Sequence, residues 1–268
     1  MDCMNDAQFK YFDDFRNRFR EKVKEWSEFS DQLQKLQEQA AAGKDGKADY
    51  RIETPVVYNT ALDAVTKDDE IRLIIIGDNP GKNEQLGKNR KYLVGLAGKL
   101  GQKFFAENPE LGIDFRKNAI ILNKTPVHSA RTEQLKYIIK NGSPQLNAMI
   151  TESQEWMARE TALLHMNLAR LGGKGSYVPQ LWLVGYAELK GKGLFLTYRD
   201  TLVNTYETDF CTDNVYTFQH FSMNRFTIDL KNYMEKKGSL SPENTEKASL
   251  AKDLAELGSL HRKEILGV

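Results

Sequence analysis

The sequence predicts an α/β protein: a three-layer α/β/α fold around a central, mostly parallel four-stranded sheet, with extra helices at both ends of the chain. Short apolar runs rich in β-branched residues alternate along the chain with longer segments of helical period. Three of the short runs end at a glycine or an asparagine, where a chain turns easily. This alternation favours parallel strands covered by helices on both faces.

The N-terminal part is predicted to form one long amphipathic helix over residues 5–40. Its apolar side chains recur at spacings near three and four, at Phe12, Phe15, Phe19, Val23, Trp26, Leu33 and Leu36. The stretch 40–49 is small and polar with two glycines, so we expect it to end the helix as a linker. Residues 1–50 are assigned to a helical extension. We expect its aromatic stripe to pack on the core; a partner-binding helix is the alternative.

Residues 51–237 are assigned to the α/β domain itself. Its strands are predicted at 71–76, 118–123, 181–185 and 215–218, and its helices at 95–106, 145–171 and 226–236. The glycine-rich stretch 172–175 is expected to stop the second of these helices. Residues 238–268 are assigned to a linker at 238–249 and a last helix near 250–265 that docks on the body.

Composition excludes several classes of protein. Hydrophobic residues make up 40% of the 268 positions and charged residues 28%, which excludes a chain disordered throughout. The longest apolar runs fall far short of the roughly 20 residues that a membrane-spanning helix needs. Two cysteines cannot build a disulfide scaffold, a four-cysteine zinc site or an iron–sulfur cluster, and the histidines lack metal-ligand spacing. We therefore expect no metal and no cofactor.

The start of the chain and its charge lead to further expectations. No basic segment followed by an apolar stretch opens the sequence, so we expect an intracellular protein of the cytoplasm or nucleoid. We also expect a monomer. The net charge is +1, yet residues 81–140 hold 12 lysines and arginines against five acidic residues, a net +7. A basic stretch on a near-neutral protein indicates an anionic partner such as phosphate or nucleic acid. A solvated lysine-rich surface is the alternative.

Ligands of parallel sheets bind outside the carboxyl ends of the strands, which directs attention to the segments that follow them. After the first strand comes Gly77-Asp78-Asn79-Pro80-Gly81, a tight turn where backbone amides can approach a ligand. It is not a Walker loop, because only three residues separate its glycines and no Ser or Thr follows Lys82. An ordinary strand–helix connection is the alternative.

Two further polar residues follow later strands. The amide of Asn123 can donate and accept together, which suits the edge of a nucleobase, although a strand-end asparagine is also a common turn residue. His220 lies between Gln219 and Arg225, where an imidazole could donate to a developing negative charge. A structural histidine between aromatic neighbours is the alternative.

The order and placement of these motifs resemble the uracil-DNA glycosylase superfamily over roughly residues 55–236. The first turn resembles the Gly-x-Asn-Pro-Gly of its mismatch-specific and single-strand-selective branches. The segment 91–98, Lys-Tyr-Leu-Val-Gly-Leu-Ala-Gly, resembles the Arg-Pro-Phe-Val-Gly-x-Ala-Gly of its iron–sulfur branches. Ile121-Leu-Asn123 resembles Leu-Leu-Asn, and His220-Phe-Ser222 resembles His-Pro-Ser.

The resemblance implies a role for each matching residue. Asn79 would position the attacking water, with Asp78 as a second candidate, and His220 would stabilise negative charge on the departing base. Asn123 would bond the edge of the flipped base. The other implied substrate contacts are Gly77, Pro80, Gly81, Leu93 and Ser222. The expected contacts to DNA are Lys82, Lys88, Lys124, Met223 and Arg225.

The sequence also departs from the family. Leu93 stands where a Phe often stacks on the base, and Phe221 replaces the Pro of His-Pro-Ser. The cluster cysteines are missing, so no iron–sulfur cofactor is expected. Gly81 stands where the most uracil-selective branch has a Tyr that blocks thymine, which implies looser exclusion of larger bases.

The function implied is that of a monofunctional DNA glycosylase in base excision repair. It would flip uracil or a related damaged base out of DNA and hydrolyse its N-glycosidic bond. The first alternative is a catalytically inactive member of the same fold that binds nucleic acid or a nucleotide. The second is an unrelated doubly wound enzyme that acts on a small phosphorylated ligand.

Overall fold

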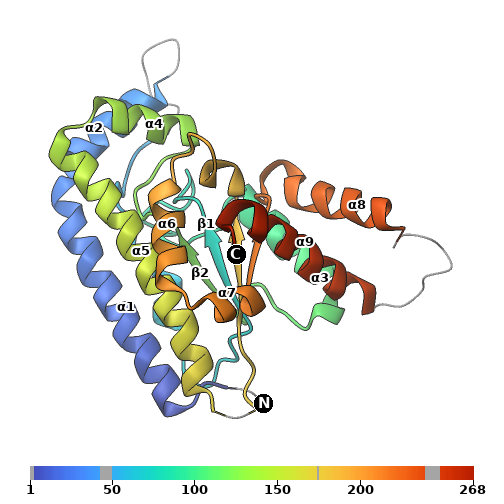
Figure 1. Cartoon of the computed structure of the whole chain (residues 1–268). Coiled ribbons are helices and arrows are strands. Elements are labelled where there is room, and N and C mark those ends of the chain that lie inside the picture. Colours follow the sequence, from blue (N-terminus) through green and yellow to red (C-terminus); the bar gives the residue numbers. More distant parts are fainter. Residues whose placement is uncertain (1–2, 43–49, 174, 239–247) are drawn as a thin grey trace.

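The computed structural model describes residues 3–42, 50–173, 175–238 and 248–268 (Figure 1). Its centre is a four-stranded sheet in the order β2-β1-β3-β4, in which all neighbouring strands are parallel. The strands are β1 (Leu73–Gly77), β2 (Ala119–Asn123), β3 (Gln180–Val184) and β4 (Val215–Phe218). The register places Gly77 of β1 opposite Asn123 of β2, so two predicted site segments leave the sheet side by side.

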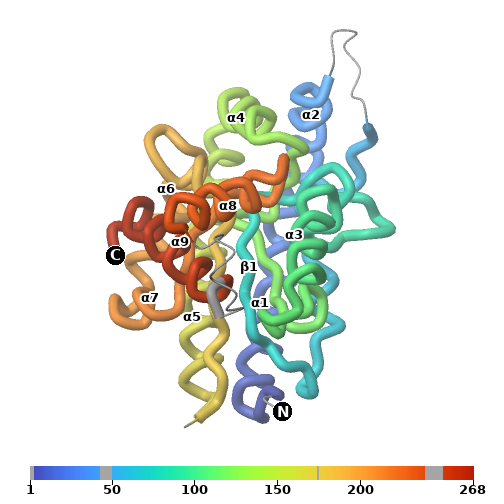
Figure 2. The backbone as a smooth tube through the Cα atoms, turned by 90° about the vertical axis from the view of Figure 1, so that its right-hand side faces the viewer, coloured from blue at the N-terminus to red at the C-terminus, as the bar shows by residue number. Residues whose placement is uncertain are grey.

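Helices cover both faces of the sheet, which confirms the predicted three-layer α/β/α class (Figures 1 and 2). One layer contains α1 (Asp6–Trp26), α2 (Ser30–Ala41), α4 (Thr132–Asn141), α5 (Pro144–Leu171) and α6 (Leu196–Thr205). The other contains α3 (Leu96–Glu107), α8 (Arg225–Lys237) and α9 (Ala248–Leu266). The short α7 (Thr208–Asn214) leads into β4.

The predicted N-terminal helix is two helices. The single helix expected over 5–40 is wrong in this respect, because a 3-10 turn at Ser27–Phe29 separates α1 from α2. The Ser27 hydroxyl donates to the Val23 carbonyl at 2.6 Å, a local bond that competes with regular helix geometry. Sequence reasoning did not predict α4, α6 or α7. Most of the two expected linkers, residues 43–49 and 239–247, lies outside the described residues. Residue 174, in the glycine-rich stretch expected to stop a helix, lies outside them too.

The aromatic stripe of α1 packs on the core through α5. Phe15 and Phe19 are fully buried, and Phe19 stacks on Trp156 of α5 with ring centroids 5.6 Å apart. Both residues belong to the same hydrophobic cluster as the strands. The N-terminal extension therefore shares one core with residues 51–237.

The C-terminal helix α9 docks against β4. Leu254 and Leu257 are buried, and the Arg262 side chain is 2% exposed. Its guanidinium donates to the Val215 carbonyl at 2.9 Å and also to the Thr212 carbonyl. These bonds fasten the end of the chain to the strand that precedes His220.

No helix among the described residues is both long and apolar enough to cross a bilayer. Within the same residues, no group of three or more His, Cys, Asp or Glu side chains is arranged to hold a metal ion. Cys3 is exposed, Cys211 is buried and both are free thiols.

Candidate active site

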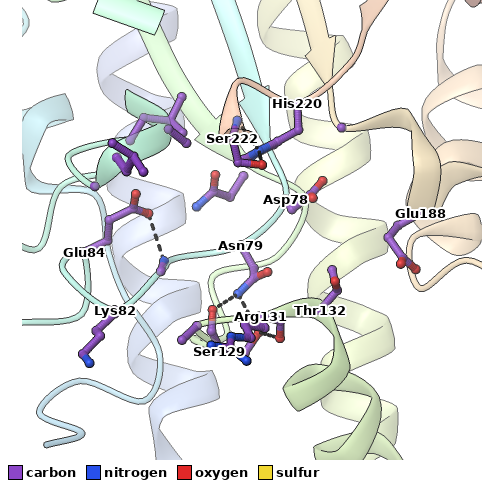
Figure 3. A pocket seen from close by; sticks show the side chains of 18 of the residues that line it. Asp78, Asn79, Lys82, Glu84, Ser129, Arg131, Thr132, Glu188, His220 and Ser222 are labelled. Carbon is purple, nitrogen blue, oxygen red and sulfur yellow. Dashed lines mark hydrogen bonds between the residues drawn. The ribbon is translucent and has the colours of Figure 1, made fainter. Parts of the chain in front are cut away.

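A cleft of about 660 Å³ opens at the carboxyl ends of the strands, where ligands of parallel sheets bind (Figure 3). Its lining comes from the segments that follow all four strands. Asp78, Asn79, Asn123 and His220 all line it, as do the predicted contacts Gly81, Lys82, Leu93, Ser222, Met223 and Arg225. The predicted contacts Gly77, Pro80, Lys88 and Lys124 are not among its lining residues.

The Asn79 amide is held in one orientation. Its Nδ2 donates to the carbonyl and to the hydroxyl of Ser129, each at 2.9 Å. The Ser129 hydroxyl in turn donates to the Arg131 carbonyl at 3.0 Å. The Oδ1 atom of Asn79 is thereby turned away from Ser129, as an acceptor with a fixed direction. Sequence reasoning missed Ser129, because a serine in a loop carries no signal of its own.

Asn123 presents a buried donor without a partner. The side chain is 1% exposed and lines the cleft, and no described residue accepts a hydrogen bond from its Nδ2. Its Oδ1 lies against Gly77, where a Cβ would come within 2.5 Å of that oxygen. A buried unsatisfied donor costs about 1–3 kcal/mol, and a ligand acceptor would recover that cost. Gly77 therefore acts by leaving room for the amide, although it does not line the cleft.

His220 is fixed as a neutral donor. The backbone N–H of Ser222 donates to its Nδ1 at 3.1 Å, and the Ser222 hydroxyl lies 2.7 Å from the same atom. A backbone N–H can only donate, so Nδ1 carries no hydrogen and the neutral ring bears its proton on Nε2. Burial lowers the pKa of His220; Asp78 opposes the shift, and Lys124 and Arg225 reinforce it. The ring is therefore neutral at pH 7, with an N–H to offer.

Phe221, which stands where the His-Pro-Ser motif has its proline, is buried beside His220. The side chain is 2% exposed and turns into the core. It packs on Phe226 of α8 with ring centroids 5.1 Å apart and edge-on to Phe115 at 6.2 Å. The substitution thus anchors the His220 loop to the core.

Glu84 is a buried carboxyl at the cleft that sequence reasoning missed. It is 6% exposed, and its Oε2 accepts from the Gly81 backbone N–H at 3.1 Å. Burial raises its pKa to about 7, while backbone donors at Gly81, Gly95, Leu93 and Val94 oppose the shift. The carboxyl therefore accepts hydrogen bonds both from the turn after β1 and from the segment that leads into α3. Both segments lie along the cleft.

Glu84 makes stability depend on pH. Its pKa is about 7 in the folded chain against 4.5 for an ordinary glutamate, so the folded state binds the extra proton between these values. The free energy of unfolding should therefore fall by about 3 kcal/mol as pH rises from about 4.5 through 7. Urea unfolding of wild type and Glu84→Gln at pH 5 and pH 8 tests this, because the variant should lack that component. An identical pH dependence in both proteins would contradict the assignment.

The prediction that Lys124 contacts phosphate is wrong. Its side chain is fully buried, and its ammonium lies 2.5 Å from the Asp78 carboxylate. Pro80 is also buried, and its carbonyl lies 2.8 Å from His128 Nδ1, so it shapes the loop from behind the cleft. Lys88 is exposed but is not part of the cleft.

The apolar surface of the cleft is aliphatic. Leu93 is 4% exposed with φ +51°, and the Arg116 guanidinium holds its carbonyl. Leu96 and Met223 also line the cleft and are about 70% and 67% exposed respectively. No Phe, Tyr or Trp occurs among the described residues that line it. The apolar contacts that the cleft offers to a ligand are therefore aliphatic.

Comparisons with known proteins assign no family to the chain. No protein-family model matches it, and a search of curated proteins found no match. The function is therefore inferred from the chemistry of the cleft and from the motifs in the sequence.

Proposed function

We propose that the protein is a monofunctional DNA glycosylase of base excision repair that extrudes uracil or a related damaged base and hydrolyses its N-glycosidic bond. The observation that carries the proposal is the buried, unpartnered Nδ2 donor of Asn123, which faces the same cleft as the neutral imidazole of His220. Such a protein would act on chromosomal DNA in the cytoplasm or nucleoid, as a monomer.

The cleft suits a base removed from the helix. A stacked base cannot reach groups in such a recess, so the enzyme must extrude it, at a cost of a few kcal/mol that is least for a mispaired base. The Asn123 Nδ2 would donate to a carbonyl oxygen of the extruded base, which satisfies the buried donor. The cleft has open space beside Gly81, since a Cβ on this residue would meet nothing within 4 Å.

Hydrolysis then uses the remaining polar groups. Water attacks the sugar C1′, the C1′–N bond breaks, and its electron pair leaves with the base. The Nε2–H of His220 would donate to the base oxygen on which that charge collects. An amide cannot take a proton at neutral pH, so Asn79 would orient the water and the Asp78 carboxylate would accept its proton. The scheme needs no lysine nucleophile, so we expect no strand cleavage.

A uracil-containing oligonucleotide tests the activity directly. Incubation with the protein followed by alkali should cut the strand at the uracil position, whereas the same strand without alkali should stay intact. The matched control is the identical oligonucleotide with thymine at that position. A panel of other damaged bases, in single strands and in duplexes, then defines the preferred substrate. Failure to release any base of the panel would remove the proposal.

The affinity for DNA should depend on salt through exposed cations. Lys82 and Arg225 line the cleft and are exposed, and Lys88 is exposed nearby in sequence. Replacing any one of them by Ala should reduce the slope of log affinity against log salt by about 0.7–0.9. The control is Lys10→Ala on the exposed face of α1. Equal slopes for all four variants and wild type would argue against these phosphate contacts.

One observation favours the second candidate, a catalytically inactive member of the fold that binds nucleic acid or a nucleotide. The described lining of the cleft lacks Phe, Tyr and Trp, and stacking on such rings contributes about 1–3 kcal/mol per base in many nucleic-acid-binding proteins. The two candidates differ in one outcome: the inactive protein would bind the oligonucleotide with salt-dependent affinity and leave every base attached.

A further inference from the structure

Lys124 is a buried cation directly behind the cleft. Its side chain is fully buried, and its ammonium donates to the Asp78 carboxylate and to the Val184 carbonyl, the latter at 2.7 Å. It also lies 5.4 Å from the centre of the Phe195 ring. Lysine is almost never fully buried unless it is paired, so this arrangement needs an explanation.

The Lys124 side chain links three neighbouring strands. It follows Asn123 at the end of β2, Asp78 follows the end of β1, and Val184 ends β3. Because β1 lies between β2 and β3, the side chain passes across the end of β1. The Lys124 backbone N–H adds bonds to the Gly77 and Asp78 carbonyls at 3.0 and 3.1 Å. The residue therefore braces the end of the sheet from which Asp78 leaves.

The Asp78 carboxylate has one covered side and one side toward the cleft. Lys124 contacts its Oδ1, and a Cβ on Gly185 would come within 2.6 Å of the same oxygen. Gly185 has φ +86°, a conformation that favours glycine. The Asp78 side chain is 19% exposed and lines the cleft with Asn79 and His220 (Figure 3). The carboxylate is thus held between Lys124 and Gly185, with its open side toward the cleft.

We propose that Lys124 is a positioning residue that keeps the Asp78 carboxylate aimed at the sugar carbon under attack. The inference rests on the glycosylase function proposed above. Hydrolysis builds positive charge on the sugar while the water gives up a proton, and an oriented carboxylate serves both changes. The buried ammonium balances the carboxylate without itself reaching the substrate. Removal of either partner would leave an uncompensated charge behind the cleft.

A double-mutant cycle tests this role. Wild type, Lys124→Met, Asp78→Asn and the double variant are compared in single-turnover excision, with DNA affinity and urea unfolding measured on the same preparations. We expect Lys124→Met to lose about 100-fold in rate, because misplacement of a catalytic group by about 1 Å costs this much. Asp78→Asn should lose about 100-fold or more, because the amide cannot accept the proton of the water. The double variant should excise within about threefold of Asp78→Asn, and DNA affinity should change by less than about threefold throughout.

The controls separate positioning from folding. Lys22→Met removes another lysine paired with a carboxylate, Glu152 at 3.0 Å, on α1, which contributes no residue to the cleft; it should excise at the wild-type rate. If Lys124→Met does not fold, Lys124→Gln replaces it, because its amide keeps an N–H for the Val184 carbonyl; the same loss is expected.

Each outcome is decisive. A folded Lys124 variant that excises at the wild-type rate overturns the inference alone. So does a double variant whose loss equals the product of the two single losses, since independent effects multiply. A wild-type protein that excises no base removes the proposed function, and this inference with it.

Discussion

Replacing His220 with alanine is expected to slow base release by about 100- to 1,000-fold and to leave DNA affinity nearly unchanged. The Nε2–H of this ring would act only where charge collects on the departing base, so its loss raises the barrier without weakening the bound ground state. Single-turnover excision from a uracil oligonucleotide, with binding followed at the same salt, measures both quantities.

The contacts of His220 Nδ1 supply a control for this variant. Ser222→Ala removes the hydroxyl beside Nδ1 but keeps the backbone N–H that makes Nδ1 an acceptor, so its loss should be much smaller. Because the pKa of His220 is lowered, the reaction does not depend on an imidazolium. We therefore expect no fall in the wild-type rate from loss of a proton on His220 as pH rises from 6 to 8. An unchanged rate in His220→Ala would show that the ring is structural.

Changing Asn123 to aspartate is expected to exchange the base that the cleft accepts. The substitution replaces the unpartnered Nδ2 donor by an acceptor, which repels the carbonyl of uracil and suits the amino group of cytosine. Sites built to hydrogen-bond one group reject an analogue lacking it by about 10⁴-fold, so excision of uracil should fall by this order relative to excision of cytosine.

The measurement is a single-turnover comparison of two oligonucleotides that differ only in uracil or cytosine at one position. Asn17→Asp, on the exposed face of α1, is the matched control for the change of amide to carboxylate. Urea unfolding of both variants shows whether the buried carboxylate has disturbed the fold. A folded Asn123→Asp protein that keeps the wild-type preference for uracil would refute the role of this amide.

The strands and their order of appearance were predictable because the β-branched runs end at turn residues. The shared edge of the parallel sheet then brought Asp78, Asn123 and His220 to one cleft. The helices α4, α6 and α7 were missed for a physical reason. They are 10, 10 and 7 residues long, which is fewer than three helical turns, so an apolar period has little room to repeat along any of them.

The wrong prediction for Lys124 shows that a single sequence does not reveal which charged side chains are buried. A lysine directly after a strand is ordinarily solvent-exposed, and its partner Asp78 lies 46 residues earlier in the chain. Glu84 is a second case, because the backbone N–H groups of residues 93–95 reach its carboxyl across a loop that has no regular period. Both contacts are formed by loops in the folded chain, and hydrophobic periodicity does not predict how loops fold.

The docking of α9 sets a limit on how the protein can be shortened. A version cut after residue 238 would keep every residue of the cleft, yet it would leave the Val215 and Thr212 carbonyls without the donor that Arg262 provides. It would also uncover the surface of Tyr216 and Phe218, against which Gly258 packs closely. The last 21 residues are therefore part of the minimal folding unit, and a fragment defined by the sequence motifs alone would be a poor choice for expression.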